Sequence, residues 1–235
     1  MEILSPSYQH SPLIVYDLNG TELILRLPQH DGTYEPTLAA SNVDIFDHSI
    51  YREGYQPIPY LILIQNSWTY RFANSPIDAG HLILGIGVTH YLEGQETDFL
   101  NKASFSQWVL TRFQENYGPL IEEEILELKA NDLPIIEEKM WQYPKAPGDL
   151  KEFSKCGIHW CMAKTGHPSM GKLDPVLLVP INKTHALEIS TTFGGFNPEY
   201  FDSIDTIEEI KETLLQEFLE HVHINYSPET LAKIS

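Results

Sequence analysis

The sequence has few cysteines, and it contains no long apolar run. Two cysteines in 235 residues are too few for a disulfide-stabilised scaffold. The longest apolar runs, such as Leu82–Val88, last at most seven residues, whereas a membrane-spanning helix needs about 20. The first residues have neither a basic region nor an apolar core, so they do not resemble a signal peptide. These absences predict a soluble, cytoplasmic protein that does not associate with membranes.

Basic residues are scarce beside acidic ones. The chain has 33 aspartates and glutamates but only 15 lysines and arginines, which gives a formal net charge of −18. Nucleic-acid binding depends on basic side chains that neutralise phosphates, so this balance argues against direct binding of DNA or RNA. Hydrophobic residues make up 42% of the sequence, which is enough to form a folded core.

The negative charge is unevenly distributed. Residues 1–117, 118–150 and 186–235 carry net charges of −8, −5 and −8, whereas residues 151–185 carry +3. The lysines of this basic interval are Lys151, Lys155, Lys164, Lys172 and Lys183. Such an interval can receive an anionic group or brace a neighbouring acidic helix.

Turn motifs between β-rich runs predict antiparallel strands. Asn19-Gly20 tolerates the positive φ angles of a type I′ hairpin turn, and residues 182–185 form another hairpin candidate. Asn66-Ser67 predicts a further hairpin between two shorter runs. The expected strands cover residues 13–18, 22–27, 58–65, 68–72, 81–91, 157–163, 175–181 and 187–192.

Apolar spacing changes to a helical period near residue 97. The pattern predicts one helix over 97–117 and a second that begins at Pro119, because proline is favoured in a first helical turn. Glutamates would then crowd the N-terminal half of the second helix and complement its dipole. A last helix is expected over about 206–223, with Thr206 and Glu209 at capping-box spacing.

Together these elements predict an α+β fold with mostly antiparallel, twisted sheet and helices grouped at about 97–131 and 206–223. Residues 1–235 are expected to form a single domain. It could contain two sub-lobes, 1–142 and 152–235, joined by the Pro/Gly-rich loop 143–151.

Cysteine and histidine concentrate in the segment Cys156–Cys161. Thiolates and imidazoles bind zinc, but the segment has no C-x-x-C pair. On a strand, Ile158 and Trp160 point to one face, while His159 and Cys161 share the other. His159 and Cys161 are therefore candidates for a nucleophilic pair, although an ordinary strand is the favoured interpretation. The sequence predicts neither a metal site nor a cofactor.

Two further segments carry weak catalytic candidates. Residues 44–48 combine Asp44 and His48 in an expected loop, which could support acid–base chemistry. His167 opens the sequence 167–171, which differs from a nucleophile elbow because it lacks a small residue two positions before Ser169.

The favoured functional prediction is a non-catalytic, acidic protein that binds a basic protein partner, as inhibitors and immunity proteins do, helped by electrostatic steering. One alternative is a hydrolase or transferase that uses a His/Cys or Asp/His site. A second alternative is a DNA-mimic decoy, motivated by the charge of −18. The sequence does not fix the oligomeric state. The residues predicted to bind the partner are Glu123, Glu127, Glu208, Glu212, Glu220, Tyr51, Tyr55 and Trp68.

Overall fold

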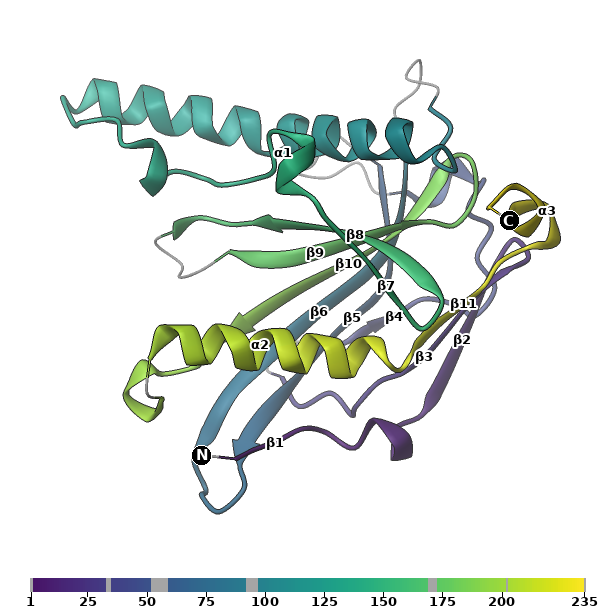
Figure 1. Ribbon diagram of the computed structural model, residues 1–235, viewed down its shortest axis with the longest axis horizontal. Helices are drawn as coiled ribbons and strands as arrows, with labels where there is room; N and C mark the ends of the chain where they lie inside the picture. The colour runs from purple at the N-terminus through teal and green to yellow at the C-terminus, as the bar shows by residue number, and fades with distance from the viewer. Residues whose placement is uncertain are drawn as a thin grey trace.

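The computed structural model describes residues 2–32, 35–51, 59–91, 97–168, 173–201 and 203–234. In this part of the chain, two antiparallel sheets pack with three α-helices, which confirms the predicted α+β class (Figure 1). The large sheet has the order β1-β5-β6-β10-β9-β8-β7, and β4 also pairs with β5. Its strands are β1 Ile3–Leu4, β4 Thr37–Leu38, β5 Tyr60–Phe72, β6 Asp78–His90, β7 Lys151–Lys155, β8 Ile158–Thr165, β9 Asp174–Pro180 and β10 His185–Gly194.

The small sheet joins distant parts of the chain. It has the order β11-β3-β2, so a strand near the C-terminus pairs with the first hairpin. In the large sheet, β6 pairs with β10, and strands on both sides of the loop 143–151 therefore share one sheet. The remaining bounds are β2 Leu13–Leu18, β3 Thr21–Arg26, β11 Val222–Asn225, α1 Lys102–Ala130, α2 Ile204–Leu219 and α3 Pro228–Ile234.

Two of the three predicted hairpins are confirmed. Asn19 and Gly20 have φ angles of 55° and 86°, as a type I′ turn requires, and Leu18 pairs with Thr21. At the other turn, the Ile181 amide donates to the His185 carbonyl at 2.9 Å, closing the β9–β10 hairpin.

The hairpin predicted at Asn66-Ser67 is wrong, because β5 runs through both residues as one 13-residue strand. Asn66 and Ser67 are only 5% and 4% exposed. The Asn66 side chain donates to the Pro28 carbonyl at 3.2 Å, so this polar residue is satisfied inside the fold. A buried hydrogen-bond partner thus replaces the turn that the local sequence favours.

The two helices predicted over 97–131 are a single helix. α1 starts after Asn101, whose side chain accepts a hydrogen bond from the Ser104 amide, and continues for 29 residues. Pro119 lies inside this helix rather than at its start. The proline cannot donate a backbone hydrogen bond at this point, and packing of the preceding turns holds the helix in place.

The last helix begins earlier than its expected cap. Ser203 precedes α2, and its Oγ accepts a hydrogen bond from the Thr206 amide at 3.1 Å. The predicted cap at Thr206 is therefore wrong, because an equally suitable serine stands three residues before it.

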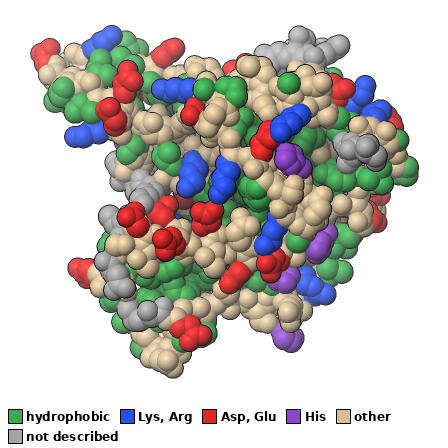
Figure 2. All heavy atoms as spheres, viewed as in Figure 1, with side chains coloured by type: hydrophobic (Ala, Val, Ile, Leu, Met, Phe, Trp, Pro, Cys, Tyr) green, Lys and Arg blue, Asp and Glu red, His purple; other side chains and the backbone are tan. Residues whose placement is uncertain are grey.

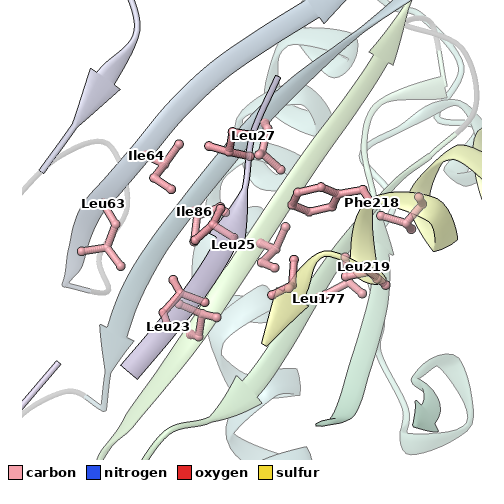
Figure 3. Packing of buried hydrophobic residues seen from close by; sticks show 14 of the residues in the cluster. Leu23, Leu25, Leu27, Leu63, Ile64, Ile86, Leu177, Phe218 and Leu219 are labelled. Carbon is pink, nitrogen blue, oxygen red and sulfur yellow. The ribbon is translucent and has the colours of Figure 1, made fainter. Parts of the chain in front are cut away.

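The large sheet buries side chains on both faces. On one face, the small sheet and α2 cover a core in which Leu23, Leu25, Ile86 and Phe218 meet (Figure 3). On the other face, α1 covers a second core. Strand β8 serves both, since Trp160 and Met162 belong to the first core, whereas Cys161 and Ala163 belong to the second. This alternation confirms the face assignment expected from the sequence.

Only the N-terminal half of α1 is held against the sheet. Trp108, Val109 and Phe113 are buried there. Arg112, which is 1% exposed, donates from Nη2 to Glu188 on β10 at 2.5 Å. Figure 1 shows the other half of α1 extending past the ends of β8 and β9. The sheet therefore fixes the base of the helix and leaves its C-terminal half projecting.

Candidate functional site

The Cys/His segment does not provide an activated nucleophile. Cys161 is buried, and this burial raises the pKa of its thiol to about 12, so the reactive thiolate is scarce at neutral pH. His159 instead faces solvent, where its ring lies 3.5 Å from Glu152. Cys156 is exposed in the turn before β8, with a φ of 53°. These contacts favour the ordinary-strand interpretation.

Asp44 stabilises a loop. Its Oδ1 accepts hydrogen bonds from the Phe46 amide at 3.1 Å and from the Asn19 side chain at 3.0 Å. Asn19 in turn accepts from the Ile45 amide at 2.7 Å. The carboxylate thus joins the first hairpin turn to the loop before His48, a role in which its hydrogen-bonding capacity is used locally.

His48 belongs to a cluster of aromatic and imidazole rings. Its ring lies 4.9 Å from His90, and His90 lies 5.6 Å from His185 and 4.7 Å from Tyr51. Burial lowers the pKa of His90, and burial with the neighbouring His90 lowers that of His185 to about 4. The imidazoles of His90 and His185 are therefore neutral at pH 7, and both pack as core residues. Among the described residues, no group of three or more His, Cys, Asp or Glu side chains could hold a metal ion.

His167 lies on the other side of the molecule. Its Nε2 is 3.2 Å from Glu124 on α1, and its ring meets Trp141 edge-on at 5.5 Å. The weak candidates thus separate into three places: the Asp44–His48 loop, strand β8, and the contact between His167 and α1. No single site collects them.

The predicted partner-binding glutamates of α2 have partners inside the protein. Glu212 pairs with Lys151 at 2.9 Å, and Glu220 pairs with Lys155 at 2.8 Å, which lowers the pKa of both carboxyls. Glu208 pairs with Lys211 at 3.1 Å. The lysines of β7 therefore brace the acidic helix, one of the two roles that the sequence suggested for the basic interval.

Two of the three predicted aromatic anchors are buried. Tyr51 and Trp68 are 8% and 2% exposed, so neither ring offers a face to a partner. The Tyr51 hydroxyl donates to the Ile45 carbonyl at 2.8 Å. Tyr55, the third of these aromatics, lies outside the described residues.

Exposed apolar and charged side chains lie together in residues 119–139, which we call the arm. It consists of the projecting half of α1 and the segment that returns along it. The arm carries seven acidic and two basic residues, a net charge of −5. Glu123 and Glu127 are both exposed here, as predicted partner-binding residues must be. Figure 2 shows apolar, acidic and basic side chains together in this projecting part of the surface.

Several apolar side chains of the arm are exposed. Leu126 is 66% exposed and Leu133 is 53% exposed. Three more apolar residues of the arm are also exposed, namely Leu120, Ile135 and Ile136. Large apolar side chains gathered on one projection, rimmed by charges, are typical of protein–protein contact surfaces.

Because α1 is one continuous helix, its glutamates do not have the helix-stabilising role that the sequence predicted for them. In a helix that began at Pro119 they would complement the helix dipole. In the observed helix, Glu127 lies in the last turn before Ala130, where a negative charge opposes the dipole. Glu123 and Glu127 are also spaced i, i+4, so they repel each other. Helix stability therefore does not explain this cluster of acids.

The sequence predicted Glu123 and Glu127 as partner-binding residues, and both are exposed, but it did not predict the exposed apolar side chains beside them. Leucine is usually a buried residue, so the sequence alone would place Leu126 and Leu133 in a core, and only the overhang of α1 shows that this part has no sheet beneath it. The sequence signal that could have found it is the dense charge of residues 122–127 beside those leucines.

Comparison with family models, curated proteins and solved structures finds no match to this chain. Among the described residues, no helix has the length and apolar character needed to cross a membrane.

Proposed function

We propose that this is a non-catalytic binding protein whose docking surface is the arm, and that its partner is a protein presenting basic side chains around an apolar patch. The observation that carries the proposal is the combination, on one projection, of net charge −5 with Leu126 and Leu133 both more than half exposed. A partner of this chemistry would bury the leucines and relieve the repulsion between Glu123 and Glu127.

The distribution of charge supports the arm over α2 as the contact region. The three glutamates predicted to bind the partner there, Glu208 and Glu212 on α2 and Glu220 just after it, are paired with lysines at 2.8–3.1 Å, so a partner would compete with existing ion pairs. For Glu123 and Glu127, no ion pair is formed with another described residue. The net field of the arm would steer a basic partner towards it.

The two alternatives have less support. A thiol-dependent enzyme would need a depressed cysteine pKa, whereas burial raises that of Cys161. A DNA mimic would need unpaired acids in a long array, and three of the acids on α2 are each paired with a lysine.

Site-specific photo-crosslinking tests the proposal. A photoreactive residue replaces Leu126 in the arm or, as the matched control, Leu13 on β2, which is 55% exposed. In a lysate of the source cells at low salt, we expect the Leu126 probe to form a discrete adduct with a basic protein that the Leu13 probe does not form. Equal adducts from both positions, or a partner without a basic surface, would reject the arm as the docking surface.

A further inference from the structure

A cavity of about 490 Å³ lies beside the base of the arm. Its walls come from α1, the segment after the arm, the end of β8, the ends of β9 and β10 that face it, and α2. The space-filling view shows the surface recessed between the projecting arm and the layer that contains α2 (Figure 2). The volume falls in the range of ligand-binding cavities, and it exceeds that of a single side chain.

One wall of the cavity is aromatic. The rings of Tyr117 and Trp141 lie 5.4 Å apart, and Tyr117 stacks on Tyr143 at 5.8 Å with an interplanar angle of 13°. Trp141 is partly exposed. Phe193 and Phe196 also line the cavity, with ring centroids 6.3 Å apart. Aromatic faces of this kind attract cations through the ring quadrupole.

The cavity also contains a desolvated carboxylate. Asp174 opens β9 and accepts a hydrogen bond from the Phe193 amide at 3.3 Å. Asp174 is partly buried, and this partial burial raises the pKa of its carboxyl because it removes some of the water around the charge. Lys211 also lines the cavity; its ammonium lies 3.1 Å from Glu208, and its charge and a hydrogen bond with the Thr192 side chain each lower the pKa of Asp174 in part. Among the described residues, none forms a salt bridge with Asp174.

A second acidic oxygen near the cavity lacks a donor. Glu124 holds His167, a lining residue, through Oε1 at 3.2 Å. Its Oε2 is buried and has no hydrogen-bond partner among the described residues.

We propose that this cavity receives an arginine side chain of the partner, with Asp174 as its carboxylate contact and Trp141 and Tyr117 as its aromatic contacts. The proposal rests on the proposed function in so far as the partner is basic. Arginine fits better than lysine, because a planar guanidinium can stack on a ring while it donates to a carboxylate. An anionic ligand would meet the Asp174 charge, and an apolar ligand would remove water from that carboxylate without adding a hydrogen bond to it.

Titration with capped tripeptides tests this site without the protein partner. The probe is acetyl-Gly-Arg-Gly-amide, and its control is the citrulline peptide, which has nearly the same shape and no charge. Trp68, Trp108 and Trp160 are at most 4% exposed, so a fluorescence change on binding reports Trp141. We expect saturable binding of the arginine peptide and at least about tenfold weaker binding of the citrulline peptide. Equal binding of the two peptides, or no saturable change with either, would overturn the proposal.

A pair of charge-matched variants locates the binding. Asp174→Asn should weaken binding of the arginine peptide about tenfold. Asp98→Asn removes the same charge before the start of α1 and should leave binding unchanged. If Asp174→Asn does not fold, amide shifts in the wild-type protein decide the matter: they should move at Gly166, Gly194 and Gly195, which line the cavity. Shifts confined to other surfaces would contradict the assignment.

The outcomes for the cavity and the arm can be distinguished. Peptide binding that depends on Asp174, without a partner captured at Leu126, would retain the cavity and reject the docking role of the arm. Capture at Leu126 without peptide binding would do the reverse.

Discussion

Arg112 and Glu188 form an ion pair buried between α1 and the large sheet, with side chains 1% and 10% exposed and a nitrogen–oxygen distance of 2.5 Å. The guanidinium also donates from Nη1 to Thr89 on β6 at 2.9 Å. This contact fixes the base of α1 to two strands at once. The projection of the arm depends on that anchor, because beyond Gly118 no residue of the helix is buried.

Loss of one member of this ion pair should strongly destabilise the protein. Arg112→Met leaves the charge of Glu188 buried without its partner, and we expect the free energy of unfolding to fall by about 3–5 kcal/mol in urea titrations. The double variant Arg112→Met/Glu188→Met buries no charge and should recover part of the loss. If the single and double variants lose the same free energy of unfolding, the charge pairing of Arg112 and Glu188 does not hold α1 against the sheet.

The buried histidines should make the protein less stable in mild acid. The pKa of His185 is lowered from 6.5 to about 4. Between these pH values, His185 is mostly protonated in the unfolded chain and mostly neutral in the folded protein. Stability is then full above pH 6.5 and falls as the pH drops towards 4, by about 3 kcal/mol for this group. His90 adds to the same trend, because burial and the charge of His48 lower its pKa.

Urea titrations between pH 7.5 and pH 5 measure this dependence. His185→Gln should flatten the profile, whereas the exposed His159→Gln should keep it. A wild-type profile that is flat over this range would contradict the buried, neutral state of His185.

The two cysteines should differ in reactivity. Cys156 is exposed, whereas Cys161 is buried with a pKa of about 12. Iodoacetamide at pH 8 should therefore add one group to the native protein, and none on the same timescale to the Cys156→Ser variant, as measured by mass spectrometry. Rapid modification of Cys161 in the native protein would return support to a cysteine-dependent activity.

The leucines of the arm should contribute little to stability. Leu126→Ser and Leu133→Ser change side chains that are 66% and 53% exposed, so the free energy of unfolding should stay within about 0.5 kcal/mol of the wild type. Leu178→Ala, at a fully buried position, should cost about 2–5 kcal/mol. A large decrease in the free energy of unfolding of either arm variant would mean that these leucines are more buried than the structure shows.

Local chemistry predicted several elements of the fold. Asn19-Gly20 specifies its hairpin because the turn needs two residues that accept positive φ. The alternation around Trp160 and Cys161 specifies the two faces of β8. These signals act over a few residues, so the sequence alone is enough to find them.

Other elements depend on contacts that are distant in the sequence. Asn66 looks like a turn residue, but its partner is the carbonyl of Pro28. Pro119 looks like a helix start, but the ion pair between Arg112 and Glu188, 76 residues apart, holds the preceding turns. The candidate site also has features that the local sequence predicts and features that depend on tertiary contacts. The acids Glu123 and Glu127 could be predicted, whereas the exposure of Leu126 and the cavity at Asp174 arise only from tertiary structure.

The most direct test of the account is the dissociation constant of the cross-linked partner, once identified, for an arm variant and for an α2 variant of equal charge change. Glu123→Gln/Glu127→Gln changes the arm, and Glu212→Gln/Glu220→Gln changes two glutamates that are already paired. We expect the arm variant to weaken binding at least about tenfold at low salt and the α2 variant to change it little. Equal weakening by both variants, or weakening by the α2 variant alone, would contradict the arm as the docking surface.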